Sequence, residues 1–121
     1  MGSVYTVSSL PSNSGTTIEN PIKVLRKTVK AGVSSTSSTD VTFTLSDTDP
    51  KIYLENLISV CMVSASSSIN CDFLRVKTTT DSNGSYVTAF VGVIEKVNSG
   101  STASSPAIAS TIYLNVAYLN S

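Results

Sequence analysis

Two segments of the chain place a large apolar residue at every second position, and this pattern decides the fold class. In segment 41–46 these residues are Val41, Phe43 and Leu45. In segment 111–119 they are Ile112, Leu114, Val116 and Tyr118, with Thr111, Tyr113, Asn115 and Ala117 between them. A period of two is typical of a strand with one buried face. Because no segment sustains the 3.6-residue period of an amphipathic helix, we predict an all-β protein.

The other apolar segments are bounded by turn residues, which completes the predicted set of strands. Further strands are expected over 21–33, 57–63, 69–80 and 86–97. Asp81-Ser82-Asn83-Gly84-Ser85 is typical of a tight hairpin, since Asn-Gly tolerates positive φ. A short helical turn is expected over 51–55, after Asp49-Pro50. Short strands separated by turns predict one antiparallel β-sandwich domain, Ig-like or jelly-roll-like, over residues 21–121.

Two of these strands allow predictions about individual faces. In strand 57–63, one face is expected to carry Ile58, Val60 and Met62. In strand 86–97, one face carries Val87, Ala89, Val91 and Val93, and the other carries Tyr86, Phe90 and Ile94. A strand that is apolar on both faces is usually covered on both sides. We therefore expect the core to cover one face of this strand and a partner to cover the other.

Residues 1–20 differ in composition from the rest of the chain, because they are polar and rich in turn-forming residues. Ser, Asn, Pro and Gly dominate the stretch from Ser8 to Gly15. Such a segment has few side chains that could join a core. We predict an extended N-terminal arm over 1–20 that becomes ordered only against a partner.

The composition limits the classes of function. Nearly a third of the 121 residues are Ser or Thr, charged residues make up 13%, and the formal net charge is zero. A neutral chain lacks the electrostatic footprint of a protein that binds nucleic acid or a membrane surface, so we expect neither as a partner. A hydroxyl-rich surface with little charge suits packing against other proteins, which predicts protein partners in an assembly.

Catalysis and metal binding are not expected. The chain has no His, so the commonest general base is absent and neither cysteine can form a Cys–His nucleophile. Asp47-Thr48-Asp49 and Asp81-Ser82-Asn83-Gly84 place oxygen atoms in loops, but turn formation explains both without calcium. We predict no enzymatic activity, no catalytic residues, no metal and no cofactor.

The two cysteines are predicted to face each other and to remain thiols. A turn centred on Ser66 would pair Val63 with Ile69, and would then place Cys61 directly opposite Cys71. Cross-strand Cβ atoms lie about 4.5–5.5 Å apart, whereas a disulfide prefers about 3.8 Å. The first residues also lack the features of a secretory signal, which favours reduced thiols. A structural disulfide is the alternative.

Half of the basic residues lie in one predicted strand. They are Lys23, Arg26, Lys27 and Lys30. Charge on a strand commonly marks a sheet edge, and an acidic protein surface is the expected partner for this one. Tyr113 lies opposite the apolar face of the last strand and is expected to be exposed as an interface anchor. These five residues form the predicted partner interface.

Taken together, the chain resembles a class of proteins rather than a single family. The relevant features are the arm 1–20, the segment Val41-Thr42-Phe43-Thr44-Leu45, the strand 86–97 and the terminal segment 111–119. Small Ser/Thr-rich β-proteins of this kind are similar to accessory virion proteins of tailed phages, such as capsid decoration proteins and fibre heads or adaptors. The resemblance implies a virion location, capsid or tail proteins as partners, and a homo-oligomer, with a trimer as one form.

Two other functions are compatible with the same features. One is a carbohydrate- or receptor-binding β-sandwich, which could also stand at the tip of a fibre. The other is a subunit of a bacterial surface fibre or adhesin, for which a secretory signal would be expected.

Overall fold

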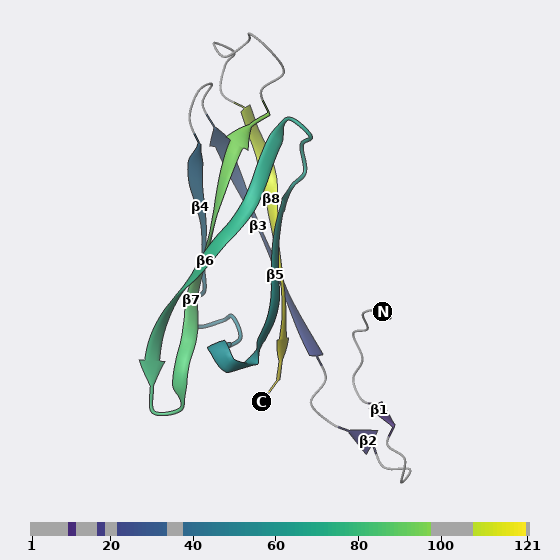
Figure 1. Cartoon of the computed structure of the whole chain (residues 1–121), viewed down its shortest axis with the longest axis vertical. Helices are drawn as coiled ribbons and strands as arrows, with labels where there is room; N and C mark the ends of the chain where they lie inside the picture. Colours follow the sequence, from purple (N-terminus) through teal and green to yellow (C-terminus); the bar gives the residue numbers. More distant parts are fainter. Residues whose placement is uncertain (1–9, 12–16, 19–21, 34–37, 98–107, 121) are drawn as a thin grey trace.

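The computed structural model describes residues 10–11, 17–18, 22–33, 38–97 and 108–120, and its sandwich consists of two three-stranded antiparallel sheets (Figure 1). The strands are β3 (Ile22–Val33), β4 (Thr39–Thr44), β5 (Leu57–Ser64), β6 (Ile69–Asp81), β7 (Gly84–Lys96) and β8 (Ile108–Leu119). One sheet has the order β3-β8-β5 and the other has the order β4-β7-β6. The predicted all-β sandwich is confirmed.

The chain crosses repeatedly from one sheet to the other. β3 and β4 lie in different sheets, as do β5 and β6, and β7 and β8. The hairpin between β6 and β7 stays within one sheet, with Asp81 paired to Gly84 and Gly84 at a φ of 126°. This is the conformation that Asn-Gly was expected to supply, because glycine has no Cβ to oppose positive φ. β7 and β8, the last two strands in the sequence, are the central strands of the two sheets.

The core lies between the sheets and is supplied mainly by the two central strands. The side chains of Phe90, Ile94, Ile112 and Leu114 are fully buried there. Phe43 of β4 lies directly opposite Phe90 of β7 and packs into the same core. The predicted alternation is confirmed in both segments. Val41 and Phe43 are buried and Thr42 and Thr44 are exposed, and Leu114 is buried beside the exposed Tyr113. An apolar inner face on every strand is what holds the sheets together.

Two predictions about strand faces are wrong because the strands contain β-bulges. The register of β5 shifts between Leu57 and Ser59, so Ile58 is 49% exposed while Met62 on the same strand is buried. The register of β6 against β7 shifts where Lys77 is followed by Thr78, and Val87 then joins the core cluster, which excludes Ala89 and Val91. A bulge adds one residue to a strand and thereby reverses the faces beyond it.

The predicted pairing of the cysteines is also wrong. Cys61 lies opposite Asn115 of β8, and Cys71 lies opposite Ile94 of β7. The prediction assumed a hairpin within one sheet, whereas the turn between β5 and β6 leads from one sheet to the other. Both cysteines carry free thiols, Cys61 exposed and Cys71 partly buried. Burial is the main cause that raises the pKa of the Cys71 thiol, with smaller effects of Asp72 and Cys61.

The predicted helical turn is present in a displaced and shorter form. It is the 3₁₀ turn Leu54–Asn56, which follows Tyr53 rather than Asp49. No helix among the described residues is long and apolar enough to cross a membrane. Within the predicted arm, β1 (Leu10–Pro11) and β2 (Thr17–Ile18) pair with each other and with neither sheet. The remaining residues of 1–20, on which the prediction of partner-dependent order depends, lie outside the described ranges.

Candidate interaction surface

The basic run lies on β3, which is an edge strand as predicted, but its four charges point to two sides. Arg26 lies opposite Asn115 and Lys30 lies opposite Thr111, on the side of the sheet that faces away from the core. Lys23 and Lys27 lie opposite the buried residues Tyr118 and Leu114, which places them on the core side. Since successive side chains of a strand alternate between faces, the run divides into two pairs.

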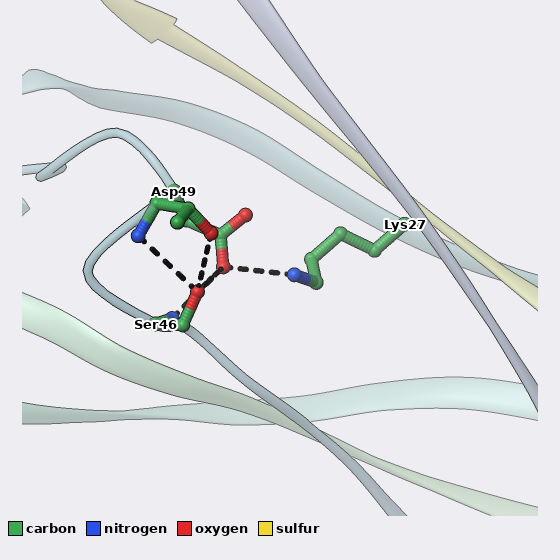
Figure 2. A network of polar contacts seen from close by, with 4 residues as sticks. Lys27, Ser46 and Asp49 are labelled. Carbon is green, nitrogen blue, oxygen red and sulfur yellow. Dashed lines mark hydrogen bonds and ion pairs between the residues drawn. The ribbon is translucent and has the colours of Figure 1, made fainter.

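Lys27 forms an ion pair across the edge of the sandwich (Figure 2). Its Nζ lies 2.8 Å from Oδ2 of Asp49, which belongs to the loop after β4. The same oxygen accepts hydrogen bonds from the backbone N–H of Ser46 at 2.8 Å and from its Oγ at 3.2 Å. The hydrogen bond from Lys27 is the main cause that lowers the pKa of Asp49. Asp49 therefore closes a turn, as predicted from the sequence. Its ion pair with Lys27 also joins the two sheets, which the sequence did not predict.

The side of the β3-β8-β5 sheet that faces away from the core, called the β8 face below, exposes large apolar side chains. Val24 is 47% exposed, Val63 43%, Leu119 42% and Tyr113 38%. Ile58, at the bulge in β5, is also exposed. The described outward positions of these strands include the cations Arg26 and Lys30 and no carboxylate. The expected exposure of Tyr113 is confirmed.

Near the middle of the β8 face lies an open hollow of about 310 Å³. It is lined by Arg26, Lys27, Thr28, Tyr113, Leu114 and Asn115. Nε of Arg26 donates a 2.8 Å hydrogen bond to Oδ1 of Asn115, its cross-strand neighbour. This bond engages Nε of Arg26 and leaves the terminal N–H groups of the guanidinium as donors for a partner. Three of the five predicted interface residues thus line one hollow, while Lys23 and Lys30 do not.

The corresponding side of the β4-β7-β6 sheet, called the β7 face below, has a different composition. Its central strand carries Ala89 and Val91, which are already buried in the single chain. Val91 lies between Thr42 and Arg75, and Val93 lies between Asp40 and Asp72. Ala89 and Val91 on the outward side of β7 are therefore covered by neighbouring side chains of the same chain, so their burial does not require the partner expected from the sequence.

A second polar cluster, which sequence analysis did not find, joins the β6–β7 hairpin to the segment before β5. Oδ2 of Asp81 accepts hydrogen bonds from Lys51 Nζ and from the Tyr53 hydroxyl, each at 2.8 Å. Lys51 Nζ also lies 4.2 Å from the centroid of the Tyr86 ring. The hydrogen bond from Lys51 is the main cause that lowers the pKa of Asp81 to about 2. These contacts bring together residues about 30 positions apart, and no local pattern in the sequence predicts such a contact.

Among the described residues there is no group of three or more Cys, Asp or Glu side chains that could hold a metal ion. Comparison with protein-family models, with curated proteins and with solved structures finds no match. The β8 face and its hollow are therefore the features from which a function can be argued.

Proposed function

We propose that this protein is a non-enzymatic structural protein that acts through protein–protein contacts of its β8 face in a multimeric assembly. The observation that carries the proposal is the group of exposed apolar side chains on this face, namely Val24, Val63, Tyr113 and Leu119, with Ile58 beside them. The strand register places them in two groups, Tyr113 with Val63 and Leu119 with Val24 and Ile58, on either side of Arg26 and Asn115. Several large apolar side chains exposed on one face of a sheet favour an interaction site. Tyr and Arg are also the residues most enriched among energetic hot spots of interfaces.

The form of the assembly follows from the charge and composition of the chain. A net charge of zero removes the repulsion that keeps free monomers apart, so a homo-oligomer, with a trimer as one form, fits this protein. The class resemblance supports a virion component that decorates or stabilises a capsid or is associated with a fibre. In such a particle, Arg26 and Lys30 would face acidic surfaces of capsid or tail proteins, whereas Lys23 and Lys27 lie on the core side and Lys27 is already paired with Asp49. Nucleic acid and membrane would not be partners.

The first test measures mass in solution over a range of protein concentrations. Sedimentation velocity should show a discrete oligomer that dissociates on dilution. The double variant Val63→Thr/Tyr113→Thr keeps residues suited to strands and should weaken association by about tenfold or more. Leu54→Gln is the matched control, because Leu54 is equally exposed but lies on the 3₁₀ turn outside the β8 face. Equal dissociation of both variants would contradict the proposed interface.

A second test addresses the virion assignment. An antibody against the protein should label intact particles purified from cultures that produce it, in a regular pattern under the electron microscope. Labelling that is absent from intact particles and present on the cell surface would favour a surface fibre or adhesin instead.

One observation favours a carbohydrate- or receptor-binding module as the second candidate. The hollow combines the Tyr113 ring with the Arg26 guanidinium and the Asn115 amide, which together offer a stacking surface and hydrogen-bond donors. A glycan array is the direct test. Specific binding that is lost in Tyr113→Thr would support this candidate.

A further inference from the structure

We infer that the occupant of the β8 face is a second copy of this chain, which docks with its β7 face. The inference rests on the proposed function, and it names both surfaces of the contact. It is drawn from the charges on the outward sides of the two sheets. The β8 face carries cations and no described carboxylate, whereas the β7 face groups three carboxylates around Val93, with Arg75 and Lys77 further along β6.

The first step concerns cations that lack a carboxylate partner. Lys27 and Lys51 are neutralised within the chain by Asp49 and Asp81. Arg26 hydrogen-bonds to the neutral amide of Asn115, and no described carboxylate contacts Arg26 or Lys30. Both lie on the β8 face beside exposed apolar side chains, so this face fits a surface that combines carboxylates with apolar groups.

The second step identifies such a surface on the same chain. Asp40 and Asp72 lie on either side of the partly buried Val93, on the outward side of β7. Glu95 follows two positions later on the same side of the strand. All three carboxylates are exposed, and the exposed Leu74 lies close by at a bulge in β6. Asp72 and Glu95 occupy diagonal positions of neighbouring strands, where like charges repel, and cations from a second copy would relieve that repulsion. Arg75 and Lys77 follow on the same side of β6, so the acidic part of the β7 face is the end around Val93.

The third step compares the spacing of the two sets of charges. Arg26 and Lys30 are four residues apart on β3, which is about 13 Å at the usual rise per residue. Asp40 and Asp72 are separated by two inter-strand spacings, about 10 Å. The long side chains of Arg and Lys can bridge the difference. Because the cations follow one strand and these carboxylates lie across three, the strands of the two copies should cross steeply, as in orthogonally packed sheets.

The contact joins different surfaces of the two copies, so one copy keeps an unused β7 face and the other keeps an unused β8 face. A contact of this type closes into a ring when the rotation between copies allows it, and otherwise continues as a chain. A trimeric ring would use every β8 face and every β7 face. It would also place the basic strand of each subunit against the acidic surface of the next.

Charge reversal tests the inference by sedimentation velocity. Arg26→Glu/Lys30→Glu and Asp40→Lys/Asp72→Lys should each weaken self-association by at least about tenfold, because like charges then meet. The variant that combines all four substitutions should regain association, since the charges are exchanged but again complementary. Lys23→Glu and Asp47→Lys are the matched controls, because both residues are exposed but lie outside the two faces. Association of the unmodified protein should also weaken with salt.

The outcomes separate this inference from the function on which it rests. If both reversed pairs associate normally, or if the combined variant stays dissociated although its melting temperature is unchanged, the inference is wrong. If a reversed pair unfolds, Arg26→Gln and Asp72→Asn replace it, and each should weaken association severalfold. If Val63→Thr/Tyr113→Thr dissociates while the charge variants do not, the β8 face is used but its occupant is not this surface. An unmodified protein that is monomeric at every concentration contradicts this inference, whereas antibody labelling of intact particles then decides the proposed function.

Discussion

The outward faces of the two sheets follow the same strand alternation and yet differ in what they expose to water. On the β7 face, the central strand carries the small residues Ala89 and Val91, and the neighbouring strands flank them with polar or charged side chains. On the β8 face, the central strand carries Tyr113 and Leu119, and β5 contributes Val63 rather than a charge. Long polar side chains can cover small apolar neighbours with their aliphatic parts, and the β8 face lacks this cover.

The comparison shows that the edge strands decide whether an outward face is stable in water. The β7 face is flanked by Asp40, Asp72, Arg75 and Lys77, all exposed. None of the eight residues of β5 is charged, so one edge of the β8 face has no such protection. An uncharged edge with exposed apolar residues is where another chain is expected to pack. The predictions below test this difference.

The largest effect is expected where a side chain of the central strand points inward. Leu114 is fully buried, whereas its neighbour Tyr113 is 38% exposed on the β8 face. Leu114→Ala should lower the free energy of unfolding by about 2–5 kcal/mol through lost burial and a cavity. Tyr113→Thr, measured at a concentration where the protein is monomeric, should lower it by less than about 1 kcal/mol. Equal losses in urea denaturation would show that Tyr113 is a core residue.

A smaller loss is expected at Gly92, on the inner side of β7. A Cβ at this position would clash with Sδ of Met62 and would lie 2.7 Å from the backbone oxygen of Asp72. The Met62 side chain can move, but the backbone of β6 cannot move without disturbing the ladder that positions Asp72. Gly92→Ala should therefore cost about 1–3 kcal/mol in urea denaturation. An unchanged midpoint would show that β6 can shift beside β7 at this position without cost.

How much of this molecule could be predicted from the sequence depends on the range of the interactions involved. The period of two placed Phe43, Leu114 and Val116 in the core correctly, because alternation is a local property. The pattern could not reveal the bulges that moved Ile58 and Val87, nor the passage between sheets that separated the cysteines. These features depend on which strands pair, which is set by contacts distant in sequence.

The same distinction applies to the candidate site. The charge of β3 and the exposure of Tyr113 could be predicted, since both follow from residue type and alternation. The bond between Arg26 and Asn115 joins residues 89 positions apart and required the register of β3 against β8. The carboxylates on either side of Val93, Asp40 and Asp72, likewise come from two separate strands, so no single segment indicates them.

The largest pH-dependent effect is expected at the hairpin end of the molecule. The pKa of Asp81 is about 2, below its usual 3.8, because the carboxylate accepts hydrogen bonds from Lys51, Tyr53 and the Asn83 backbone. A lowered pKa stabilises the fold above about pH 4, and this contribution is lost as the pH falls through 2. Urea midpoints of the unmodified protein should therefore fall between pH 4 and pH 2, and Asp81→Asn should flatten this dependence. A dependence equally steep in Asp81→Asn would assign the acid sensitivity to other carboxylates.

The smallest perturbation compares the two thiols. Cys61 is exposed on the β8 face, and Cys71 is partly buried with a raised pKa. A small alkylating reagent should modify Cys61 several times faster than Cys71 in the native monomer, because the thiolate is the nucleophile and must be accessible. Under denaturing conditions without reductant, both cysteines should be alkylated. A failure to gain mass would show a disulfide and would contradict the assignment of two free thiols.

Hydroxyl-radical footprinting across the assembly transition tests the central claim, that the β8 face is a contact surface, most directly. The account predicts that modification of Tyr113 and Leu119 falls severalfold when the protein is concentrated enough to assemble. Modification of Leu54, equally exposed but remote from the β8 face, should stay constant. If Tyr113 and Leu119 remain as reactive in the assembled protein as in the monomer, the β8 face is not the surface that this protein uses.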